Sequence, residues 1–226
     1  DHLLEIGTGW GGFAIYAAKN YGCKVTTTTI SEKQYQLAKE RVEEAGLSNK
    51  ITLLLEDYRD LEGQFDKLVS IEMIEAVGYQ YFDDYFKKCS KLLKPDGLMV
   101  LQTITIADQQ YKYSIRSVDF IQKYIFPGGC LPSVSKIAET ITENTDMRII
   151  NIEDIGPHYA TTLSHWRERM YERIDEIRDM GYSDTFVRMW HYYLCYCEGA
   201  FIERAIGDVQ MIIMKPMNRD LPYLNL

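Results

Sequence analysis

The first hundred residues alternate short apolar runs with amphipathic stretches. An apolar run before Gly7 and runs at 23–30, 50–55, 66–71 and 98–106 predict strands. The stretches between them predict helices at 13–21, 31–45 and 81–93. A Lys-Pro-Asp-Gly run at 94–97 is expected to stop the third helix. Because strands alternate with helices at this spacing, we expect an α/β fold with a doubly wound parallel sheet.

The pattern changes in the second half. Residues 107–132 are aromatic and predicted to be irregular, with a break at Phe126-Pro127-Gly128-Gly129. After it we expect a capped helix at 133–142, a strand at 148–154, helical stretches at 161–181 and 183–203, and a last strand at 208–215. Tyrosines and tryptophans are frequent between 107 and 203. They indicate either an aromatic core or an apolar tunnel for a long substrate.

Length and charge limit the classes of function. A chain of 226 residues fits one domain. It begins almost on a core strand, so we expect that an upstream segment is missing. The net charge of −8 argues against a nucleic-acid binder. No apolar run is long enough for a membrane span, and no signal peptide is visible.

The five cysteines are odd in number and scattered, which favours reduced thiols over a disulfide framework. Cys195 and Cys197 lack zinc spacing and a second ligand pair, so no metal site is expected.

A glycine-rich turn follows the first strand. Gly7, Gly9 and Gly12 have the G-x-G-x-x-G spacing, and a predicted helix comes next. Glycine permits positive φ and close approach to a ligand, while the helix start directs free N–H groups at it. The turn therefore predicts a nucleotide-like ligand. The candidate cofactor-binding residues at this turn are Glu5, Ile6, Gly7, Thr8, Gly9, Trp10, Gly11 and Gly12.

Two neighbouring features separate the candidate cofactors. A nicotinamide site needs an acidic residue at the end of the second strand, which here reads Thr28-Thr29-Ile30-Ser31. The Lys-Ser/Thr pair of a P-loop is also missing. Glu5, before the first glycine, could accept from a cationic amino group such as that of S-adenosylmethionine. After the third strand, Asp57 could accept from an adenine amino group and Tyr58 could pack on the ring, or both could belong to a solvated loop.

Four stretches carry a family resemblance, in order and at fitting spacings. The chain resembles the cyclopropane-fatty-acyl-phospholipid synthases and, more distantly, the mycolic acid cyclopropane synthases. The stretches are Glu5-Ile6-Gly7-Thr8-Gly9-Trp10-Gly11-Gly12, Thr27-Thr28-Thr29-Ile30-Ser31-Glu32-Lys33-Gln34, 65–78 (FDKLVSIEMIEAVG) and 124–133 (YIFPGGCLPS).

The resemblance implies a class I methyltransferase fold, with a mostly parallel, Rossmann-like sheet of seven strands, that binds S-adenosylmethionine. Thr29 and Gln34 match positions on the ribose side of the cofactor, although Gln34 also fits a capping box with Ser31. Thr28, beside them, is a further candidate cofactor-binding residue. The adenine side is matched by Asp57, Tyr58 and Arg59.

The resemblance also implies the chemistry. The π bond of an unsaturated acyl chain attacks the sulfonium methyl group, and a base then removes a proton from the resulting cation. In this family the base is a bound bicarbonate ion, whose matching contacts here are Glu75, Gln102, Tyr159 and the backbone of Ile104. An exposed helix-start glutamate and a packed tyrosine are the plain alternatives for Glu75 and Tyr159.

Two site positions need comment. The bacterial enzymes usually carry His where this chain has Gln102, and an amide can donate a hydrogen bond but cannot be charged. Cys197 matches a cysteine often assigned to the active site. A buried thiol without a neighbouring base is more typical of a structural role.

The expected activity is methylene transfer from S-adenosylmethionine to a cis double bond of a phospholipid acyl chain. The alternatives are a methyl-branched or hydroxylated product, or an inactive lipid-binding fragment. We expect residues 1–226 to form one domain in which 107–132 and 160–205 cover the substrate. We expect the protein to lie in the cytoplasm and to bind the inner membrane face peripherally. Its oligomeric state, with a homodimer as one possibility, is left open.

Overall fold

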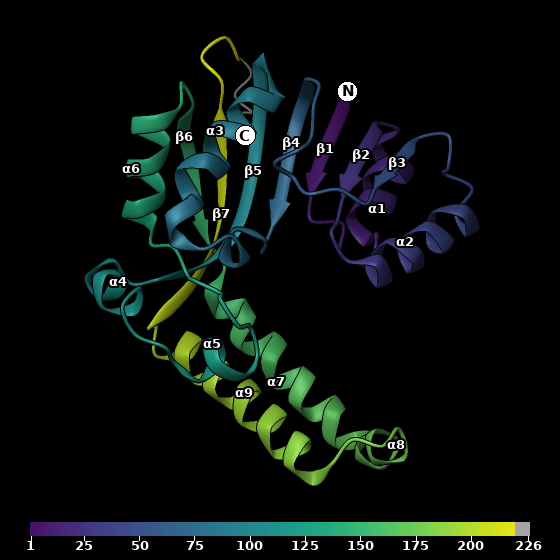
Figure 1. The fold of residues 1–226 in the computed structure, drawn as a ribbon, viewed down its shortest axis with the longest axis vertical. Helices are drawn as coiled ribbons and strands as arrows, with labels where there is room; N and C mark the ends of the chain where they lie inside the picture. Colours follow the sequence, from purple (N-terminus) through teal and green to yellow (C-terminus); the bar gives the residue numbers. More distant parts are fainter. Residues whose placement is uncertain (220–226) are drawn as a thin grey trace.

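The centre of the computed structural model, which describes residues 1–219, is a seven-stranded sheet (Figure 1). Its strand order is β3-β2-β1-β4-β5-β7-β6. The strands are β1 (His2–Ile6), β2 (Lys24–Thr28), β3 (Ile51–Leu54), β4 (Phe65–Ile71), β5 (Leu93–Ile106), β6 (Arg148–Asp154) and β7 (Ile206–Met214). All seven predicted strands are present, and the predicted fold class is confirmed.

Strand direction divides the sheet into two parts. β1, β2, β3, β4 and β5 pair in parallel, whereas β7 runs antiparallel to both β5 and β6. The carboxyl ends of β1 to β5 therefore meet at one edge, which we call the carboxyl edge. In an open α/β sheet this is the edge that binds ligands.

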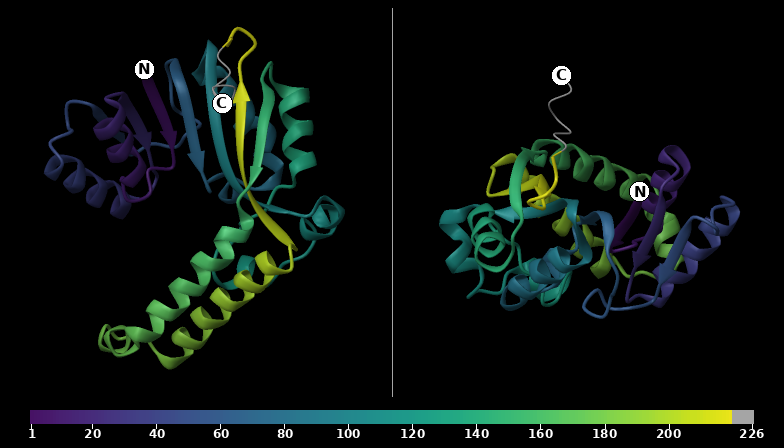
Figure 2. Two further views of the ribbon diagram at one scale, coloured as in Figure 1. Left: turned by 180° about the vertical axis from the view of Figure 1, so that it is seen from behind. Right: turned by 90° about the horizontal axis from the view of Figure 1, so that it is seen from above.

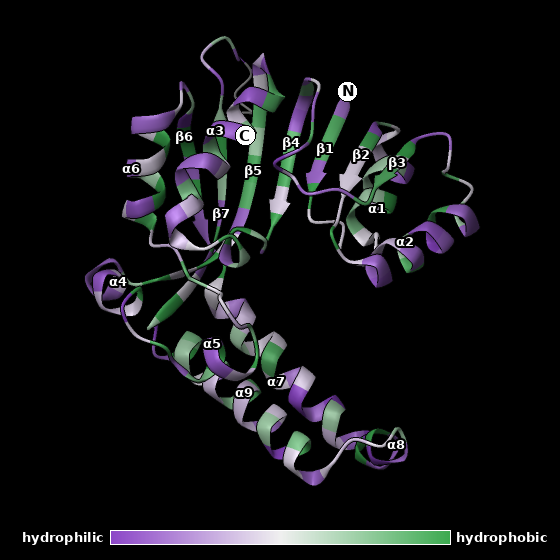
Figure 3. Cartoon of the chain, viewed as in Figure 1, coloured by the Kyte–Doolittle hydropathy of each residue, from purple (hydrophilic) through white to green (hydrophobic). Residues whose placement is uncertain are grey.

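Both faces of the sheet are buried. Along β1, Leu4 and Ile6 belong to one core cluster and Leu3 to another, because successive strand residues point to opposite faces. Figure 3 shows the apolar residues gathered in these strands and polar residues on the outer helices. The first cluster includes residues of α3 (Phe82–Leu92) and α6 (Val134–Asn144), and the second includes residues of α1 (Gly12–Tyr21) and α2 (Glu32–Glu44).

A helical arm extends beyond the carboxyl edge. It consists of α7 (Gly156–Glu172), the short α8 (Ile174–Asp179) and α9 (Asp184–Ile202). Figure 2 shows α7 and α9 side by side, projecting away from the sheet. α7 begins earlier than the predicted 161, because Pro157 lies in its first turn, where a missing N–H costs nothing.

The prediction that 107–132 is irregular was wrong in part. Two short helices form there, α4 (Asp108–Ser114) and α5 (Phe120–Tyr124). Asp119 and Gln122 make a complete capping box at the start of α5. The aromatic content hid this signal. α5 lies against the arm, where the rings of Phe120 and Tyr192 meet edge to face at 4.6 Å.

The predicted stop of the third helix before 94–97 is confirmed, whereas the strand after it begins earlier than the predicted 98. The helix α3 does end at Leu92, but β5 begins at once and pairs Leu93 with Phe65. An irregularity in the register between Phe65 and Lys67 absorbs the Pro-Asp-Gly segment.

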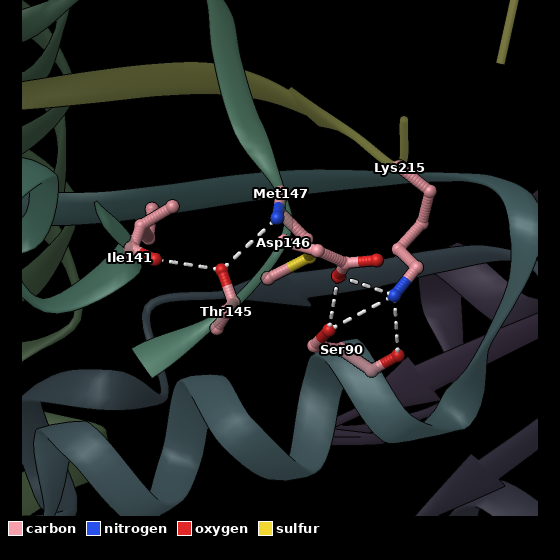
Figure 4. A network of polar contacts seen from close by, with 6 residues as sticks. All are labelled: Ser90, Ile141, Thr145, Asp146, Met147 and Lys215. Atoms are coloured by element: carbon pink, nitrogen blue, oxygen red, sulfur yellow. Dashed lines mark hydrogen bonds and ion pairs between the residues drawn. The ribbon is translucent and has the colours of Figure 1, made fainter. Parts of the chain in front are cut away.

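A polar network holds the edge of the sheet opposite the carboxyl edge (Figure 4). Lys215, just after β7, donates to Asp146 Oδ1 at 2.5 Å and to Ser90 Oγ at 3.1 Å. Ser90 Oγ in turn donates to Asp146 Oδ1 at 3.0 Å. In the loop before β6, Thr145 Oγ1 donates to the carbonyl of Ile141. These contacts join α3, the α6–β6 loop and the end of β7.

Among the described helices, none is long and apolar enough to cross a membrane.

We expect Leu68→Ala to destabilise the fold by about 2–5 kcal/mol, because Leu68 is fully buried in β4 and its removal leaves a cavity. Urea unfolding followed by circular dichroism measures this. The control is Leu55→Ala at a residue that is 45% exposed, which should change the free energy of unfolding by less than about 0.5 kcal/mol. Equal effects of the two substitutions would contradict the assignment of the core.

Candidate active site

The glycine turn joins the carboxyl ends of β1 and β2. Gly7 (φ +103°), Gly9 (φ +51°) and Gly11 (φ +78°) adopt positive φ, which favours glycine. The backbone N–H groups of Gly7 and Thr8 both donate to the carbonyl of Thr28. Gly11 precedes α1 without a side-chain cap, so the first-turn N–H groups of α1 are left for an external acceptor.

Glu5 lies buried behind this turn, 3% exposed. Its Oε2 accepts from Thr27 Oγ1 at 2.6 Å, and Thr8 and Thr27 share a hydrogen bond at 2.7 Å. Burial raises the pKa of Glu5 to about 7, against the opposing effect of the Thr27 hydrogen bond. A buried carboxyl group with a raised pKa is stabilised in its charged form by a nearby cation. The site therefore suits a cationic ligand group.

The end of β2 carries the residues expected on the ribose side of the cofactor. Thr28 Oγ1 donates to the carbonyl of Glu56 at 2.5 Å, and Thr29 Oγ1 donates to Gln34 Oε1 at 2.8 Å. Ser31 caps α2 by accepting from the Gln34 N–H. Since the Gln34 side chain turns to Thr29, only half of the predicted capping box forms. The hydrogen bond to Thr29 thus holds the Gln34 side chain against the end of β2. Its contact with the ribose stays a prediction.

The residues expected beside adenine follow β3. The guanidinium of Arg59 donates to both oxygens of Asp57 at 2.8–2.9 Å, and these contacts hold the pKa of Asp57 below its usual range. The Tyr58 ring packs edge to face on Tyr85 at 5.5 Å. Burial, together with the charge of Asp57, raises the pKa of Tyr58 to about 12. Asp57 keeps lone pairs for a further donor, so an adenine contact stays a prediction.

Trp10 is 53% exposed at the tip of the glycine turn. Its carbonyl accepts from Arg41 Nη1 at 2.7 Å, which fixes the turn against α2. Ile6 is buried, and its carbonyl accepts from Ser70 Oγ of β4 at 3.3 Å. The turn is thereby tied to strands on both sides.

Glu75 lies after β4 in a 3₁₀ helix (Ile74–Ala76). Its Oε1 accepts from Thr103 Oγ1 at 2.8 Å and from the Ile104 N–H at 2.6 Å. Its Oε2 is buried and has no hydrogen-bond partner among the described residues. Burial raises the pKa of Glu75 to about 7. The alternative of an exposed helix-start glutamate was therefore wrong.

Two further carboxylates, which sequence reasoning missed, lie close by. Gln102 Nε2 donates to Glu72 Oε1 at 2.9 Å and to Asp208 Oδ2 at 3.1 Å. Gln102 Oε1 accepts from Gln210 at 2.9 Å. Tyr159 donates its hydroxyl to Glu72 Oε2 at 2.9 Å. We call Glu72, Glu75 and Asp208 the carboxylate cluster.

The pKa of Asp208 depends on its burial and on the other members of the cluster. Asp208 is fully buried, and its Oδ1 has no partner among the described residues. Burial first, and then the charges of Glu72 and Glu75, raise the pKa of Asp208 to about 7. Burial and Glu72 likewise raise the pKa of Tyr159 far above its ordinary value. The Tyr159 hydroxyl therefore stays protonated and acts as a donor.

A sequence signal for Glu72 existed in the run Glu72-Met73-Ile74-Glu75, which places two acids at a strand end. Asp208 gave no such signal. It belongs to the last strand, and only the antiparallel pairing of β7 with β5, which sets Asp208 opposite Ile104, brings it to the site.

The glycine turn and the carboxylate cluster meet at the carboxyl edge. In the β1–β4 register, Ile6 lies opposite Ser70, two residues before Glu72. A Cβ on Gly7 would lie 3.4 Å from Met73 Cγ, so the turn packs directly beside the residue after Glu72. The backbone N–H of Cys130 donates to the Glu75 carbonyl at 2.7 Å. The turn at 126–130 thus closes another side of the cluster.

The donors expected to hold bicarbonate are already used by side chains of this chain. Both N–H bonds of the Gln102 amide go to Glu72 and Asp208, the Tyr159 hydroxyl goes to Glu72, and the Ile104 N–H goes to Glu75. The acceptor oxygens of three acidic side chains also face the place where the anion would bind. The described residues bring the four predicted contacts together, but they do not fit a bound bicarbonate ion.

Cys197 packs in the arm against a buried group that includes Leu163, Leu194 and Phe201, which Tyr159 and Ile104 also contact. Within the described residues, no hydrogen bond joins the Cys197 thiol to the carboxylate cluster. Burial raises the pKa of its thiol to about 12, so the thiol stays protonated at neutral pH. The geometry gives its predicted catalytic role no support.

Comparison with known proteins finds matches along nearly the whole chain. The model of a family described as mycolic acid cyclopropane synthetase matches residues 1–211. Tuberculostearic acid methyltransferase UfaA1 of Mycobacterium tuberculosis is 43% identical over 95% of this chain and 50% of its own length. Cyclopropane-fatty-acyl-phospholipid synthase of Escherichia coli K12 is 42% identical over 97% of this chain and 54% of its own. The chain therefore spans about half the length of these curated relatives.

Solved structures resemble the fold closely. The cyclopropane synthase MmaA2 of Mycobacterium tuberculosis has a TM-score of 0.87 at 28% identity, covering 95% of this chain and 78% of that one. The mycolic acid cyclopropane synthase CmaA1, in complex with SAH and CTAB, has the same score at 27% identity and the same coverage of both chains. SAH is the demethylated form of S-adenosylmethionine, and the likeness supports S-adenosylmethionine as the cofactor.

We expect the affinity for S-adenosylmethionine to fall by roughly five- to tenfold between pH 7.5 and pH 6. We expect the ammonium group of the cofactor to pair with the ionised form of Glu5, whose pKa is about 7 in the free protein. Binding below this pH must therefore displace a proton from the Glu5 carboxyl group. Isothermal titration calorimetry measures the affinity. The variant Glu5→Gln should bind weakly at both pH values, whereas Glu40→Gln, at an exposed residue of α2, should behave as the wild type. A pH-independent wild type would contradict the role of Glu5.

Proposed function

Because the chain belongs to the mycolic acid cyclopropane synthetase family, we propose that it transfers a methylene group from S-adenosylmethionine to the cis double bond of an unsaturated phospholipid acyl chain. The product would be a cyclopropane fatty acyl group. The observation that carries this proposal is the juxtaposition of the glycine turn, backed by Glu5, with the carboxylate cluster at the carboxyl edge. It supports a cationic cofactor beside a group of proton acceptors.

The residues of the chain support each part of this reaction. S-adenosylmethionine supplies an electrophilic methyl group. Glu5 binds its ammonium group, and the first-turn N–H groups of α1 suit the cofactor's negative or polar groups. The acidic side chains of the carboxylate cluster would stabilise an acyl cation that forms beside them. Bicarbonate, the base implied by the resemblance, stays a prediction that these contacts do not favour.

The segments 107–132 and 160–205 are proposed to cover the acyl chain. They pack against each other through ring contacts between Phe120 and Tyr192 and between Phe126 and Tyr193. Their aromatic surfaces would exclude water from the cation, which would otherwise be captured as an alcohol.

A second product is favoured by the names of the relatives. They include methyltransferases, such as the sphingolipid C9-methyltransferase 1 of Gibberella zeae at 31% identity, as well as cyclopropane synthases. The same cation would give a methyl-branched or hydroxylated chain if it were reduced or hydrated instead of losing a proton. The proposed formation of a cyclopropane ring therefore requires a group that accepts a proton from the cation.

Contact with a membrane surface follows from the proposed substrate. The arm exposes several aromatic side chains, including Trp166 and Tyr171 of α7, which are 41% and 46% exposed. Aromatic rings of this kind favour the interface of a bilayer. We propose that the protein binds the inner membrane face peripherally through the arm. Its assembly as a homodimer stays a prediction.

Vesicles of an unsaturated phospholipid, incubated with the protein and S-adenosylmethionine, should yield acyl chains that have gained one carbon and two hydrogens. Mass spectrometry of the fatty acid methyl esters distinguishes this product from a methyl-branched chain, which gains four hydrogens, and from a hydroxylated one. Glu75→Gln should lower the rate by at least about 100-fold, because it removes a carboxylate from the cluster. Full turnover by Glu75→Gln would contradict the placement of the reaction at this cluster.

Replacing Trp166 and Tyr171 together by Ser should reduce co-sedimentation with phospholipid vesicles, because it removes exposed aromatic surface from the arm. The matched control is Tyr21→Ser, at a 75% exposed tyrosine at the end of α1, far from the arm. Equal binding by both variants and the wild type would contradict membrane contact through α7.

A further inference from the structure

The carboxylate cluster contains two acids, Glu72 and Asp208, to which the proposed reaction assigns no role. Three acids at one edge are not a ligand site by themselves. Among the described residues, no group of His, Cys, Asp and Glu has the arrangement of a metal site. The cluster therefore needs an explanation other than a cation such as Mg²⁺ or Zn²⁺.

The side-chain donors of Gln102, Tyr159 and Thr103, and the Ile104 N–H, all donate to carboxylates of the cluster. Gln102 bridges Glu72 and Asp208 through one nitrogen, and Tyr159 holds the second oxygen of Glu72. Thr103 and the Ile104 N–H hold Glu75. An anion at this place would face acceptors on several sides and would find these donors engaged. The carboxylate oxygens of the cluster are therefore arranged to accept a proton.

Two buried oxygens give independent evidence for this conclusion. Asp208 is fully buried, and its Oδ1 has no partner although its Oδ2 faces Gln102 within the cluster. Glu75 Oε2 is buried and unpartnered as well. Buried acceptors without a donor are costly, and a proton carried by one carboxylate and shared with its neighbours relieves that cost.

Glu72 is the member placed to meet a substrate. It is half-buried, it follows β4 directly, and Met73 beside it touches the glycine turn. Its backbone has φ +49°, a conformation that favours glycine over glutamate. A residue other than glycine that keeps such a strained backbone conformation is typical of a functional site.

We propose that Glu72 accepts the proton lost by the newly added methyl group, so that a side chain of this protein replaces bicarbonate as the base. The inference rests on the proposed function, since it concerns the last step of the same reaction. It also explains Gln102. An amide at this position can bridge two carboxylates and accept from Gln210 at the same time.

The step balances within the site. A C–H bond of the methyl group breaks, its electron pair forms the second C–C bond of the ring, and the proton moves to a Glu72 oxygen. Each Glu72 oxygen keeps a free lone pair beside its bond to Gln102 or Tyr159. The cationic carbon becomes neutral, and Glu72 returns its proton to solvent in the next cycle.

The test measures acyl-chain turnover in carbon-dioxide-free buffer and in the same buffer with added bicarbonate. The wild-type rate should differ by less than about twofold between the two buffers. Glu72→Gln, which keeps the size of the side chain, should lose at least about 100-fold in both buffers. The matched control Glu153→Gln, at an exposed residue of β6, should keep the wild-type rate.

A second variant separates a chemical role from a structural one. Glu72→Gly suits the local φ and frees Tyr159 and one N–H of Gln102 as donors for an anion. This variant should be slow in carbon-dioxide-free buffer and should gain at least roughly tenfold from added bicarbonate or formate, while the wild type gains nothing. Rescue by a small anion would not occur if Glu72 only supported the fold.

Two results would overturn the inference. One is a wild-type rate that collapses without bicarbonate while lipid product still forms with it, which leaves the proposed function intact. The other is full turnover by Glu72→Gln. A wild type that makes no lipid product in either buffer, despite binding S-adenosylmethionine, would overturn the proposed function and this inference together.

Discussion

Burial of the central sheet on both faces is the constraint on which the rest of the structure depends. Helices cover each face, so polar groups that must meet a ligand are confined to the edges. Because β1 to β5 run parallel, their carboxyl ends bring together Glu5, in the last residues of β1, and Glu72 and Glu75, which follow β4. The cofactor turn and the carboxylate cluster are thus consequences of the same packing.

Within that edge, the balance of donors and acceptors decides the chemistry. A single amide, Gln102, satisfies two carboxylates that come from β4 and β7. Gln102, at the position where the resemblance implies His, therefore donates to both Glu72 and Asp208, two acids that the sequence analysis had not placed in the site.

Local signals gave accurate sequence predictions only where no competing local pattern or contact was present. β6 was predicted with the bounds that the structure has, because its turn signals and β-branched residues lie within a few positions. α5 was missed, although its capping box was local, because aromatic residues hid the amphipathic pattern. The capping box predicted for Ser31 and Gln34 forms only in part. The Gln34 side chain accepts a hydrogen bond from Thr29, just before the helix, instead of from the Ser31 N–H.

The sequence by itself determined the sheet, the glycine turn, the family and the approximate place of Glu75, since each depends on residue types within a short window. Only the tertiary structure decided the composition of the cluster. Asp208 is 136 residues from Glu72 in the chain (208 minus 72), and it arrives there because β7 pairs antiparallel with β5. Spacing along a chain carries no information about such a contact. The hydrogen bonds that hold the carboxylates, and the burial that raises the pKa values of Glu75 and Asp208, arise from packing between distant elements.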